Sequence, residues 1–266
     1  METTKLKIAI IGAGNMGGAI ARGLSRGTLV QNNNIFVSDV NETNLTALTT
    51  FNSSIQTSTS NAEIVKNADI VVLAVKPWLV PLVADEIKNK LDYKHQIIIS
   101  VAAGVDFSDL AGLLDTDAHL FRVIPNTAID VLQSVNCVAA HNTTKEQNDL
   151  IVALFNELGV TYLVPENQLN AFMSLSSCGI AFAFRYIRAS MEGGVEMGIY
   201  PEIAKKVVLQ TLKGAVELLE ANQTHPEVEI DKVTTPGGIT IKGLNEMEAN
   251  GFTNAVIKGL KATHLK

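Results

Sequence analysis

Three closely spaced glycines follow a short apolar run near the start of the chain, in Ile8-Ala-Ile-Ile-Gly12-Ala-Gly14-Asn15-Met16-Gly17. The run predicts a buried strand, and the glycines predict a tight turn into a helix. Unpaired N–H groups at a helix start bind anions, and Gly14 would let a ligand approach the backbone. We therefore expect a dinucleotide pyrophosphate at Gly12, Gly14, Asn15, Met16 and Gly17. A Gly-rich turn that only connects two elements is the alternative.

An acidic residue, Asp39, stands 22 residues after Gly17, at the end of the apolar segment Asn34-Ile-Phe-Val-Ser38. A carboxylate at about this separation accepts hydrogen bonds from ribose hydroxyls in NAD-binding sites. The same carboxylate would repel the 2′-phosphate of NADP, whereas Ser38, Asn41 and Asn61 could bind that phosphate. The residues leave the choice between the two cofactors open, with NADPH expected to be accepted and NADH possible.

Three more apolar runs end in turn-forming residues, namely Leu73-Ala-Val-Lys-Pro77, Ser100-Val-Ala-Ala-Gly104 and Phe121-Arg-Val-Ile-Pro-Asn-Thr127. The carboxyl ends of parallel strands face the ligand crevice of an open sheet. We expect cofactor contacts from Ala74, Val75, Lys76, Pro77, Ala102, Gly104, Pro125 and Asn126. The alternatives are a solvated lysine at Lys76, an ordinary strand-to-helix turn at Gly104 and a simple turn cap at Asn126.

A second glycine-rich segment, Val233-Thr-Thr235-Pro-Gly237-Gly238-Ile-Thr240, precedes the amphipathic stretch of residues 239–249. The unpaired N–H groups of that helix start would suit a carboxylate. We expect a substrate anion at Thr235, Gly237, Gly238 and Thr240. An ordinary helix N-cap is the alternative, although a cap needs only one hydroxyl.

These strand ends need a parallel sheet to bring them together. Apolar runs at residues 8–11, 34–38, 70–75, 97–101, 120–124, 135–140 and 160–164 predict strands, and the polar segments between several of them have the length of crossover helices. After Pro165 the pattern is helical, with helices expected at 166–193, 201–222 and 239–249. We predict an α/β fold: an N-terminal Rossmann-type, mostly parallel sheet in residues 1–164, followed by an all-helical domain in residues 165–266.

Composition favours small-molecule chemistry. The 266 residues carry a formal net charge of -6, so no basic surface for nucleic acid is expected. The apolar stretch at 171–184 is too short for a membrane span, and the start of the sequence lacks the pattern of a secretory signal, so we expect a cytoplasmic protein. The spacing of the five histidines and two cysteines predicts no metal site. Small residues in 174–183 suit either a dimer surface or an internal packing seam.

Taken together and in this order, the motifs Gly12-Ala-Gly-Asn-Met-Gly17, Leu73-Ala-Val-Lys-Pro77, Val101-Ala-Ala-Gly-Val105, Arg122-Val-Ile-Pro-Asn-Thr127 and Pro236-Gly-Gly-Ile-Thr-Ile241 resemble pyrroline-5-carboxylate reductase. The resemblance covers nearly the whole chain. It implies reduction of the ring imine of 1-pyrroline-5-carboxylate to L-proline with a nicotinamide cofactor, usually NADPH, as the last step of proline biosynthesis. It also implies a helical dimerisation domain, a homodimer and often a ring of dimers, and it assigns the contact with the imine to the Thr240 hydroxyl.

Two departures from the family pattern lie at Ser177-Cys-Gly-Ile180, where a proline is usual, and at Ala128, where another proline is common. The first departure puts the substrate or the turnover in doubt. Two alternative functions are a nucleotide-binding sensor or regulator and a beta-hydroxyacid-type dehydrogenase. The dehydrogenase would need a catalytic lysine in the central helix, and residues 166–185 contain no lysine.

Overall fold

The computed structural model describes residues 6–264. The chain divides between Ser177 and Cys178 into two compact units. The first contains the sheet, and the second contains helices only. The predicted fold class, a mostly parallel sheet followed by an all-helical region, is confirmed. The predicted domain boundary at residues 164 and 165 stays a prediction.

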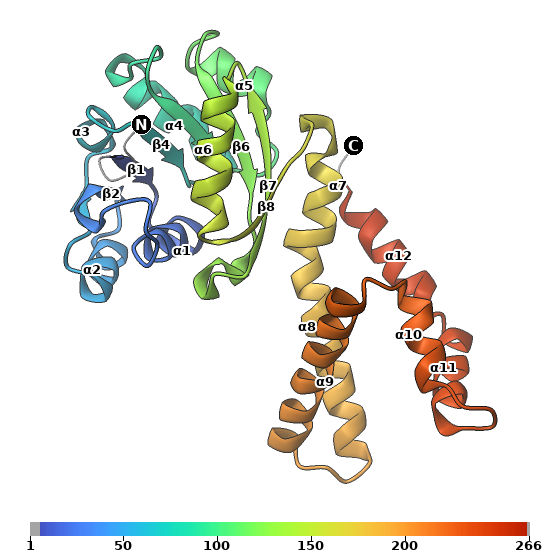
Figure 1. Ribbon diagram of the computed structural model, residues 1–266. Helices are drawn as coiled ribbons and strands as arrows, with labels where there is room; N and C mark the ends of the chain where they lie inside the picture. The colour runs from blue at the N-terminus through green and yellow to red at the C-terminus, as the bar shows by residue number, and fades with distance from the viewer. Residues whose placement is uncertain (1–5, 265–266) are drawn as a thin grey trace. The chain divides into compact units, whose positions relative to one another are not determined.

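One eight-stranded sheet forms the centre of the first unit, with the spatial order β3-β2-β1-β4-β5-β6-β7-β8 (Figure 1). All neighbouring strands are parallel except β6 and β7, which are antiparallel. The strands are β1 (Ile8–Ile11), β2 (Ile35–Ser38), β3 (Gln56–Ser58), β4 (Ile70–Leu73), β5 (Ile97–Ser100), β6 (His119–Ile124), β7 (Ser134–His141) and β8 (Gly159–Leu163). All seven predicted strands are present, and β3 is an addition that the sequence reading missed.

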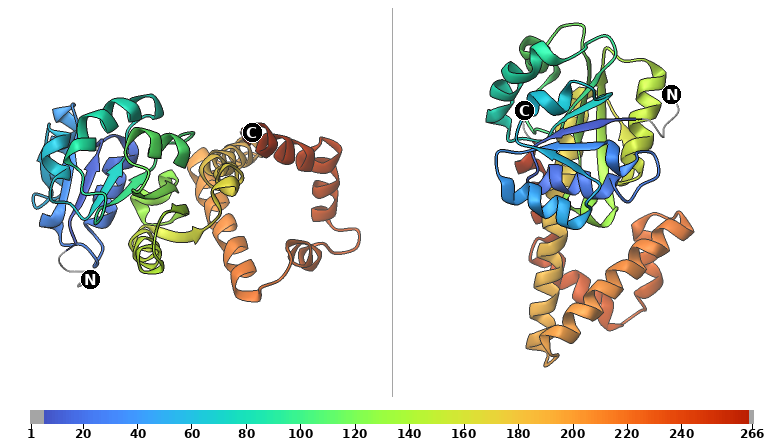
Figure 2. Two further views of the ribbon diagram at one scale, coloured as in Figure 1. Left: turned by 90° about the horizontal axis from the view of Figure 1, so that it is seen from above. Right: turned by 90° about the vertical axis from the view of Figure 1, so that its left-hand side faces the viewer.

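Helices cover both faces of this sheet (Figure 1 and Figure 2). Ile8 and Ile10 of β1 belong to the core beneath α1 (Asn15–Leu24), α2 (Glu42–Phe51) and α6 (Lys145–Asn156). Ala9 and Ile11 belong to the core on the other side, beneath α3 (Asn61–Val65), α4 (Val80–Ile87), α5 (Phe107–Leu113) and α7 (Leu169–Met173). Because both faces are buried, the strands read as continuous apolar runs.

Side-chain caps begin several of these helices. Asn41 accepts a hydrogen bond from Thr43 N–H at 3.0 Å, and Ser60 accepts one from Glu63 N–H at 3.3 Å. Asp106 and Thr144 each form a capping box. In contrast, α1 follows Gly14 and has no side-chain cap, so its first N–H groups are left for another partner. Short 3-10 turns also occur, at Asn32–Asn34, Pro77–Leu79, Lys88–Lys90, Thr127–Val131 and Glu166–Gln168.

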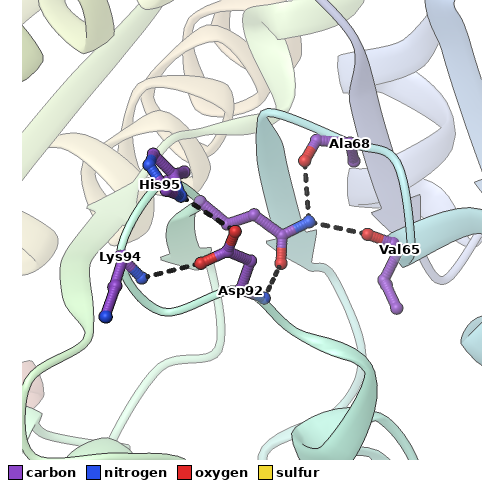
Figure 3. A network of polar contacts seen from close by, with 6 residues as sticks. Val65, Ala68, Asp92, Lys94 and His95 are labelled. Atoms are coloured by element: carbon purple, nitrogen blue, oxygen red, sulfur yellow. Dashed lines mark hydrogen bonds and ion pairs between the residues drawn. The ribbon is translucent and has the colours of Figure 1, made fainter.

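A buried glutamine, Gln96, connects the amino ends of β4 and β5 to α3; its partners Val65, Ala68 and Asp92 are labelled in Figure 3. Gln96 donates from Nε2 to the carbonyls of Val65 and Ala68, each at 2.7 Å, and accepts from Asp92 N–H at 2.7 Å. Asp92 in turn lies 2.8 Å from His95 Nδ1, and this hydrogen bond lowers the pKa of Asp92. The network stabilises the sheet at the amino ends of β4 and β5. The predicted site residues follow the carboxyl ends of the strands, at the opposite edge.

The prediction of one continuous helix over residues 166–193 is wrong, because the helix is interrupted. A 3-10 turn and α7 are followed by a π-helical turn at Ser174–Cys178, and α8 (Gly179–Glu196) begins only after it. Two serines act on the backbone there: Ser174 donates to Asn170 O at 3.1 Å and Ser176 donates to Phe172 O at 2.8 Å. Such bonds compete with the regular helical ladder, which is a physical reason for the irregular turn.

The second unit consists of α8, α9 (Pro201–Asn222), α10 (Pro226–Val233), α11 (Ile239–Ala249) and α12 (Phe252–Thr263). The helices α8 and α9 form a hairpin (Figure 1), and they approach closely where a Cβ on Gly194 would lie 3.2 Å from the Cβ of Ala204. Within residues 178–264, Ala204 is the only buried apolar side chain. Large side chains such as Phe184, Leu218 and Val256 are exposed, so this unit has almost no core of its own.

Candidate functional site

The glycine loop between β1 and α1 is packed against the end of β4. Gly12 has φ +101°, and a Cβ there would lie 2.6 Å from Ala74 O and 3.2 Å from a methyl carbon of Val75. A Cβ on Gly17 would collide with Gly12 O and lie 2.9 Å from the Cβ of Ala74. These two glycines are therefore required by the close approach of the backbone, and Ala74 and Val75 lie beside the loop.

Gly14 differs from these two glycines because the space beside it is open. An added Cβ would have no atom within 4 Å, and Gly14 and Asn15 are exposed while Met16 is half-buried. Gly14 also precedes the uncapped first turn of α1. Open space beside a helix start with unpaired N–H groups fits the pyrophosphate of a dinucleotide.

The strand register brings four strand ends to one edge of the sheet. Ile11 pairs with Ser38 of β2 and with Leu73 of β4, and Leu73 pairs with Ser100 of β5. The residues that follow these strands, Gly12, Asp39, Ala74, Val101 and their neighbours, therefore meet at this edge. Strand β6 continues the edge, since Ser100 pairs with Arg122.

Asp39 lies directly against the glycine loop. Its Oδ2 accepts a hydrogen bond from Ala13 N–H at 2.7 Å and one from Asn44 Nδ2 at 3.3 Å, and its Oδ1 accepts from Asn41 N–H at 2.8 Å. Three donors thus hold the carboxylate in one orientation. The side chain is half-buried, and a fourth acceptor position remains for a ligand hydroxyl.

Ser38, Asn61 and Glu86 form a chain of hydrogen bonds beside Asp39. The fully buried Ser38 donates from Oγ to Asn61 Oδ1 at 2.6 Å, and Asn61 donates from Nδ2 to Glu86 Oε2 at 2.7 Å. Both ends of the Asn61 amide are therefore engaged within the protein. Sequence reasoning missed Glu86, because its place on α4 gives no signal that it faces Asn61.

The other expected cofactor residues lie at the same strand ends. Lys76 is exposed and precedes a 3-10 turn that begins at Pro77. Ala102 is buried, its N–H donating to Ser100 Oγ at 3.3 Å, and Gly104 has φ +82° with open space around it. These features suit a flat ring close to the backbone at residues 102–104.

Pro125 and Asn126 follow β6, and both are buried. Asn126 Oδ1 accepts from Ala128 N–H at 3.0 Å, which caps the 3-10 turn Thr127–Val131. The turn cap that the sequence left as an alternative is thus formed. The Asn126 side chain also donates from Nδ2 to Ser176 O at 3.4 Å. This bond connects the loop after β6 to the π-helical turn.

Sequence reasoning also missed a partly buried ion pair that involves β6. Arg122 Nη1 donates to Glu166 Oε1 at 2.6 Å, and the same oxygen accepts from Phe107 N–H at 2.8 Å. The Arg122 side chain is 8% exposed. A charged residue inside the apolar strand Leu120-Phe-Arg-Val-Ile124 was the available signal, because a buried guanidinium requires a partner.

The second glycine segment lies in the helical unit and begins α11. Gly237 has φ +72°, Gly238 N–H donates to Thr235 O at 2.9 Å, and a Cβ on Gly238 would lie 2.6 Å from Thr235 Oγ1. Gly238 is the N-cap residue and no side chain caps the helix, while Thr240 is exposed in the first turn. As at α1, the N–H groups of this helix start are available to an anion.

Two family models match the chain in succession. Residues 7–104 match "NADP oxidoreductase coenzyme F420-dependent", and residues 166–266 match "Pyrroline-5-carboxylate reductase dimerisation". Pyrroline-5-carboxylate reductase 2 of Dictyostelium discoideum is 36% identical over 98% of this chain and 93% of its own length. The chain belongs to the pyrroline-5-carboxylate reductase family. The predicted resemblance is confirmed.

Other members of the pyrroline-5-carboxylate reductase family agree with this assignment. Pyrroline-5-carboxylate reductase 1 of Dictyostelium discoideum is 39% identical over 95% of this chain, which spans 48% of that relative's length. The crystal structure of a Plasmodium falciparum pyrroline carboxylate reductase with NADP bound matches with a TM-score of 0.90 and 27% identity, covering 99% of this chain and 96% of that one.

Among residues 6–264, no helix is long and apolar enough to cross a membrane. The same part of the chain holds no group of three or more His, Cys, Asp or Glu side chains that could bind a metal ion.

Proposed function

We propose that this protein reduces 1-pyrroline-5-carboxylate to L-proline with NAD(P)H, by hydride transfer to the ring imine. The observation that carries the proposal is the uncapped start of α11, preceded by Thr235, Gly237 and Gly238, in a chain of the pyrroline-5-carboxylate reductase family. A carboxylate site is needed by a reductase of this amino acid precursor and has no purpose in a nucleotide sensor. The dehydrogenase alternative lacks its lysine in residues 166–185.

We assign nucleotide binding to residues 1–164. The first turn of α1 would hold the pyrophosphate at Gly12, Gly14, Asn15, Met16 and Gly17, and the residues at the ends of β4, β5 and β6 would contact the nicotinamide half. Ser38, Asp39 and Asn61 would face the adenosine ribose. When bound, the reduced nicotinamide supplies the hydride. The protein's task at these residues is to fix the ring against the substrate, since positioning accounts for much of the catalysis of a hydride transfer.

We assign dimerisation and substrate binding to residues 165–266. The N–H groups at the start of α11, with Thr235 and Gly237 before them, would bind the substrate carboxylate. Thr240 is the catalytic residue in this proposal: its hydroxyl donates a hydrogen bond to the ring nitrogen, which makes the imine carbon more electrophilic. A threonine hydroxyl is too weak an acid to supply the proton, so water or the protonated substrate supplies it.

The helical unit also supports an oligomer. Apolar side chains on α8, α9 and α12 are exposed, and a unit of this size needs a larger core to be stable. We propose a homodimer in which the helical units of two chains bury these side chains against each other, and rings of such dimers as the higher assembly that the family resemblance implies. We propose the cytoplasm as its location.

The decisive experiment mixes the purified protein with 1-pyrroline-5-carboxylate and either NADPH or NADH, and measures both cofactor oxidation and L-proline. We expect stoichiometric proline with at least one cofactor. Cofactor binding without any proline would favour the sensor. Oxidation of a 3-hydroxyacid with NAD or NADP, in the absence of imine reduction, would favour the dehydrogenase.

A further inference from the structure

We infer that the ribose end of the nucleotide site selects NADH over NADPH, with Asp39 as the specificity-determining residue and Glu86 as a second acid that assists it. The inference rests on the proposed function and deepens it. In dinucleotide-binding folds an acid after the second strand binds the ribose 2′-hydroxyl, whereas a nearby arginine accommodates the 2′-phosphate of NADP. In this chain residues 27–65 supply the acid, Asp39, and contain no arginine.

The position of Asp39 is fixed before any ligand binds. The N–H groups of Ala13 and Asn41 and the amide of Asn44 hold its two oxygens at 2.7 to 3.3 Å. Rotation away from a phosphate would break the bond to Ala13 N–H, which is part of the glycine loop itself. A 2′-phosphate would therefore meet a fixed negative charge, while a 2′-hydroxyl would find an acceptor.

The elements that carry Asp39, Asn61 and Glu86 contain no positively charged side chain. Residues 27–65, which include β2, α2, β3 and α3, contain no Lys, Arg or His, and neither does α4 at residues 80–87. The N-terminus of α2 is already capped by Asn41, which accepts from Thr43 N–H. These elements therefore supply no cation for a phosphate, and one N–H group at the start of α2 is already bonded to Asn41.

Asn61 and Ser38, the neutral side chains that could have bound the phosphate, are engaged with each other and with Glu86. The Asn61 amide nitrogen donates to Glu86 Oε2 at 2.7 Å, and its oxygen accepts from Ser38. A phosphate that took the Asn61 N–H group would leave Glu86 beside it without that donor. Glu86 therefore adds a second repulsive contribution to that of Asp39.

The first test is equilibrium binding of NADH and NADPH to the full-length protein, measured by isothermal titration calorimetry without substrate. We expect NADH to bind at least about tenfold more tightly. The fragments 5′-AMP and 2′,5′-ADP, which differ only by the 2′-phosphate, should show the same order. Equal affinities, or tighter binding of NADPH, would overturn the inference.

Substitutions then identify the residue that determines the cofactor preference. Asp39→Ser should move the NADH/NADPH affinity ratio toward NADPH by about tenfold, and Glu86→Gln should move it in the same direction by less. Asp85→Asn is the matched control, because Asp85 neighbours Glu86 on α4 but its carboxylate pairs with Lys88. The measured quantity is the NADH/NADPH affinity ratio, because loss of the bond to Ala13 would weaken the binding of both cofactors alike. An unchanged ratio in Asp39→Ser would exclude Asp39.

The proposed reaction and the proposed cofactor preference can be refuted independently of each other. A protein that binds NADH more tightly than NADPH but forms no proline would refute the proposed reaction and leave the ribose selectivity intact. A protein that forms proline and binds NADPH at least as tightly as NADH would refute the selectivity and leave the reaction intact.

Discussion

Arg122 and Glu166 form an ion pair with N and O atoms 2.6 Å apart, although 44 positions separate them in the chain. The pair joins β6 to the segment that leads into α7, and the Glu166 carboxylate also accepts the first N–H of α5, from Phe107. Through this single carboxylate, a central strand and the starts of two helices are held together.

Glu166→Ala should destabilise the protein by about 2 kcal/mol, because it leaves the Arg122 guanidinium buried without its partner. The value is set below that for a fully buried pair, since the Glu166 side chain is 35% exposed. Urea unfolding at one fixed protein concentration measures it. Asp149→Asn removes an exposed pair with Lys145 and should change stability by less than about 0.5 kcal/mol. Equal effects of both substitutions would contradict the structural role of Glu166.

Gly14→Ala should leave the thermal stability nearly unchanged but weaken cofactor binding by at least about tenfold, because the added methyl group enters the open space before α1. Gly12→Ala should instead destabilise the fold by about 1–3 kcal/mol, since its φ is +101° and Ala74 O lies 2.6 Å from the added carbon. Calorimetric unfolding and cofactor titration separate the two effects. Gly112→Ala, in open space on α5, is the control and should bind cofactor normally.

Thr240→Ala should lower kcat about tenfold, which corresponds to one lost hydrogen bond in the transition state. The affinity for NADH or NADPH should stay unchanged, because Thr240 lies outside the nucleotide-binding residues. Thr240→Ser should retain most of the rate. Thr211→Ala, which removes an exposed hydroxyl on α9 that bonds to Val207 O, serves as the control. A normal rate in Thr240→Ala would remove the hydroxyl from the mechanism.

Phe184→Glu should convert the homodimer to monomers, because it places a charge on an exposed apolar surface of α8 that we assign to the interface. Sedimentation velocity measures the change. Leu82→Glu is the control: Leu82 is similarly exposed, at 69% against 60% for Phe184, but lies on α4 in the first unit. Monomers in the unsubstituted protein at micromolar concentration would contradict the proposed assembly.

Glu229 should contribute a pH-dependent part of the stability of the helical unit. Hydrogen bonds from Lys232, Thr224 and Asn222 lower the pKa of Glu229 from 4.5 to about 2. Since the folded pKa is the lower one, the contribution is complete above pH 4.5 and is lost as the pH falls toward 2. Over that window the melting temperature should fall more steeply in the unsubstituted protein than in Glu229→Gln. Glu202→Gln should follow the unsubstituted protein.

The amino-acid sequence was sufficient to predict the strands whose residue types are dictated by burial. The runs at Ile8–Ile11 and Ile70–Leu73 are apolar throughout because helices cover both faces of the sheet. Strand β3 was missed because Gln56, Thr57 and Ser58 form a short, polar edge strand without such a run.

Details that depend on side-chain hydrogen bonds could not be predicted. The π-helical turn before α8 depends on the hydroxyls of Ser174 and Ser176 bonding to particular carbonyls. Likewise, the glycine motif predicted a nucleotide site, but the Glu86 contact with Asn61 depends on how α4 lies against α3. Spacing along the chain does not contain that information.

The helical unit has almost no hydrophobic core, and this affects the order in which the chain folds. Residues 6–177 enclose their own hydrophobic clusters and can fold as soon as they are synthesised. Residues 178–264 bury a single apolar side chain, Ala204, so we expect their stable folding to require the second copy of the proposed homodimer. In that case folding includes a bimolecular step, and the yield of folded protein on refolding should rise with protein concentration until aggregation competes.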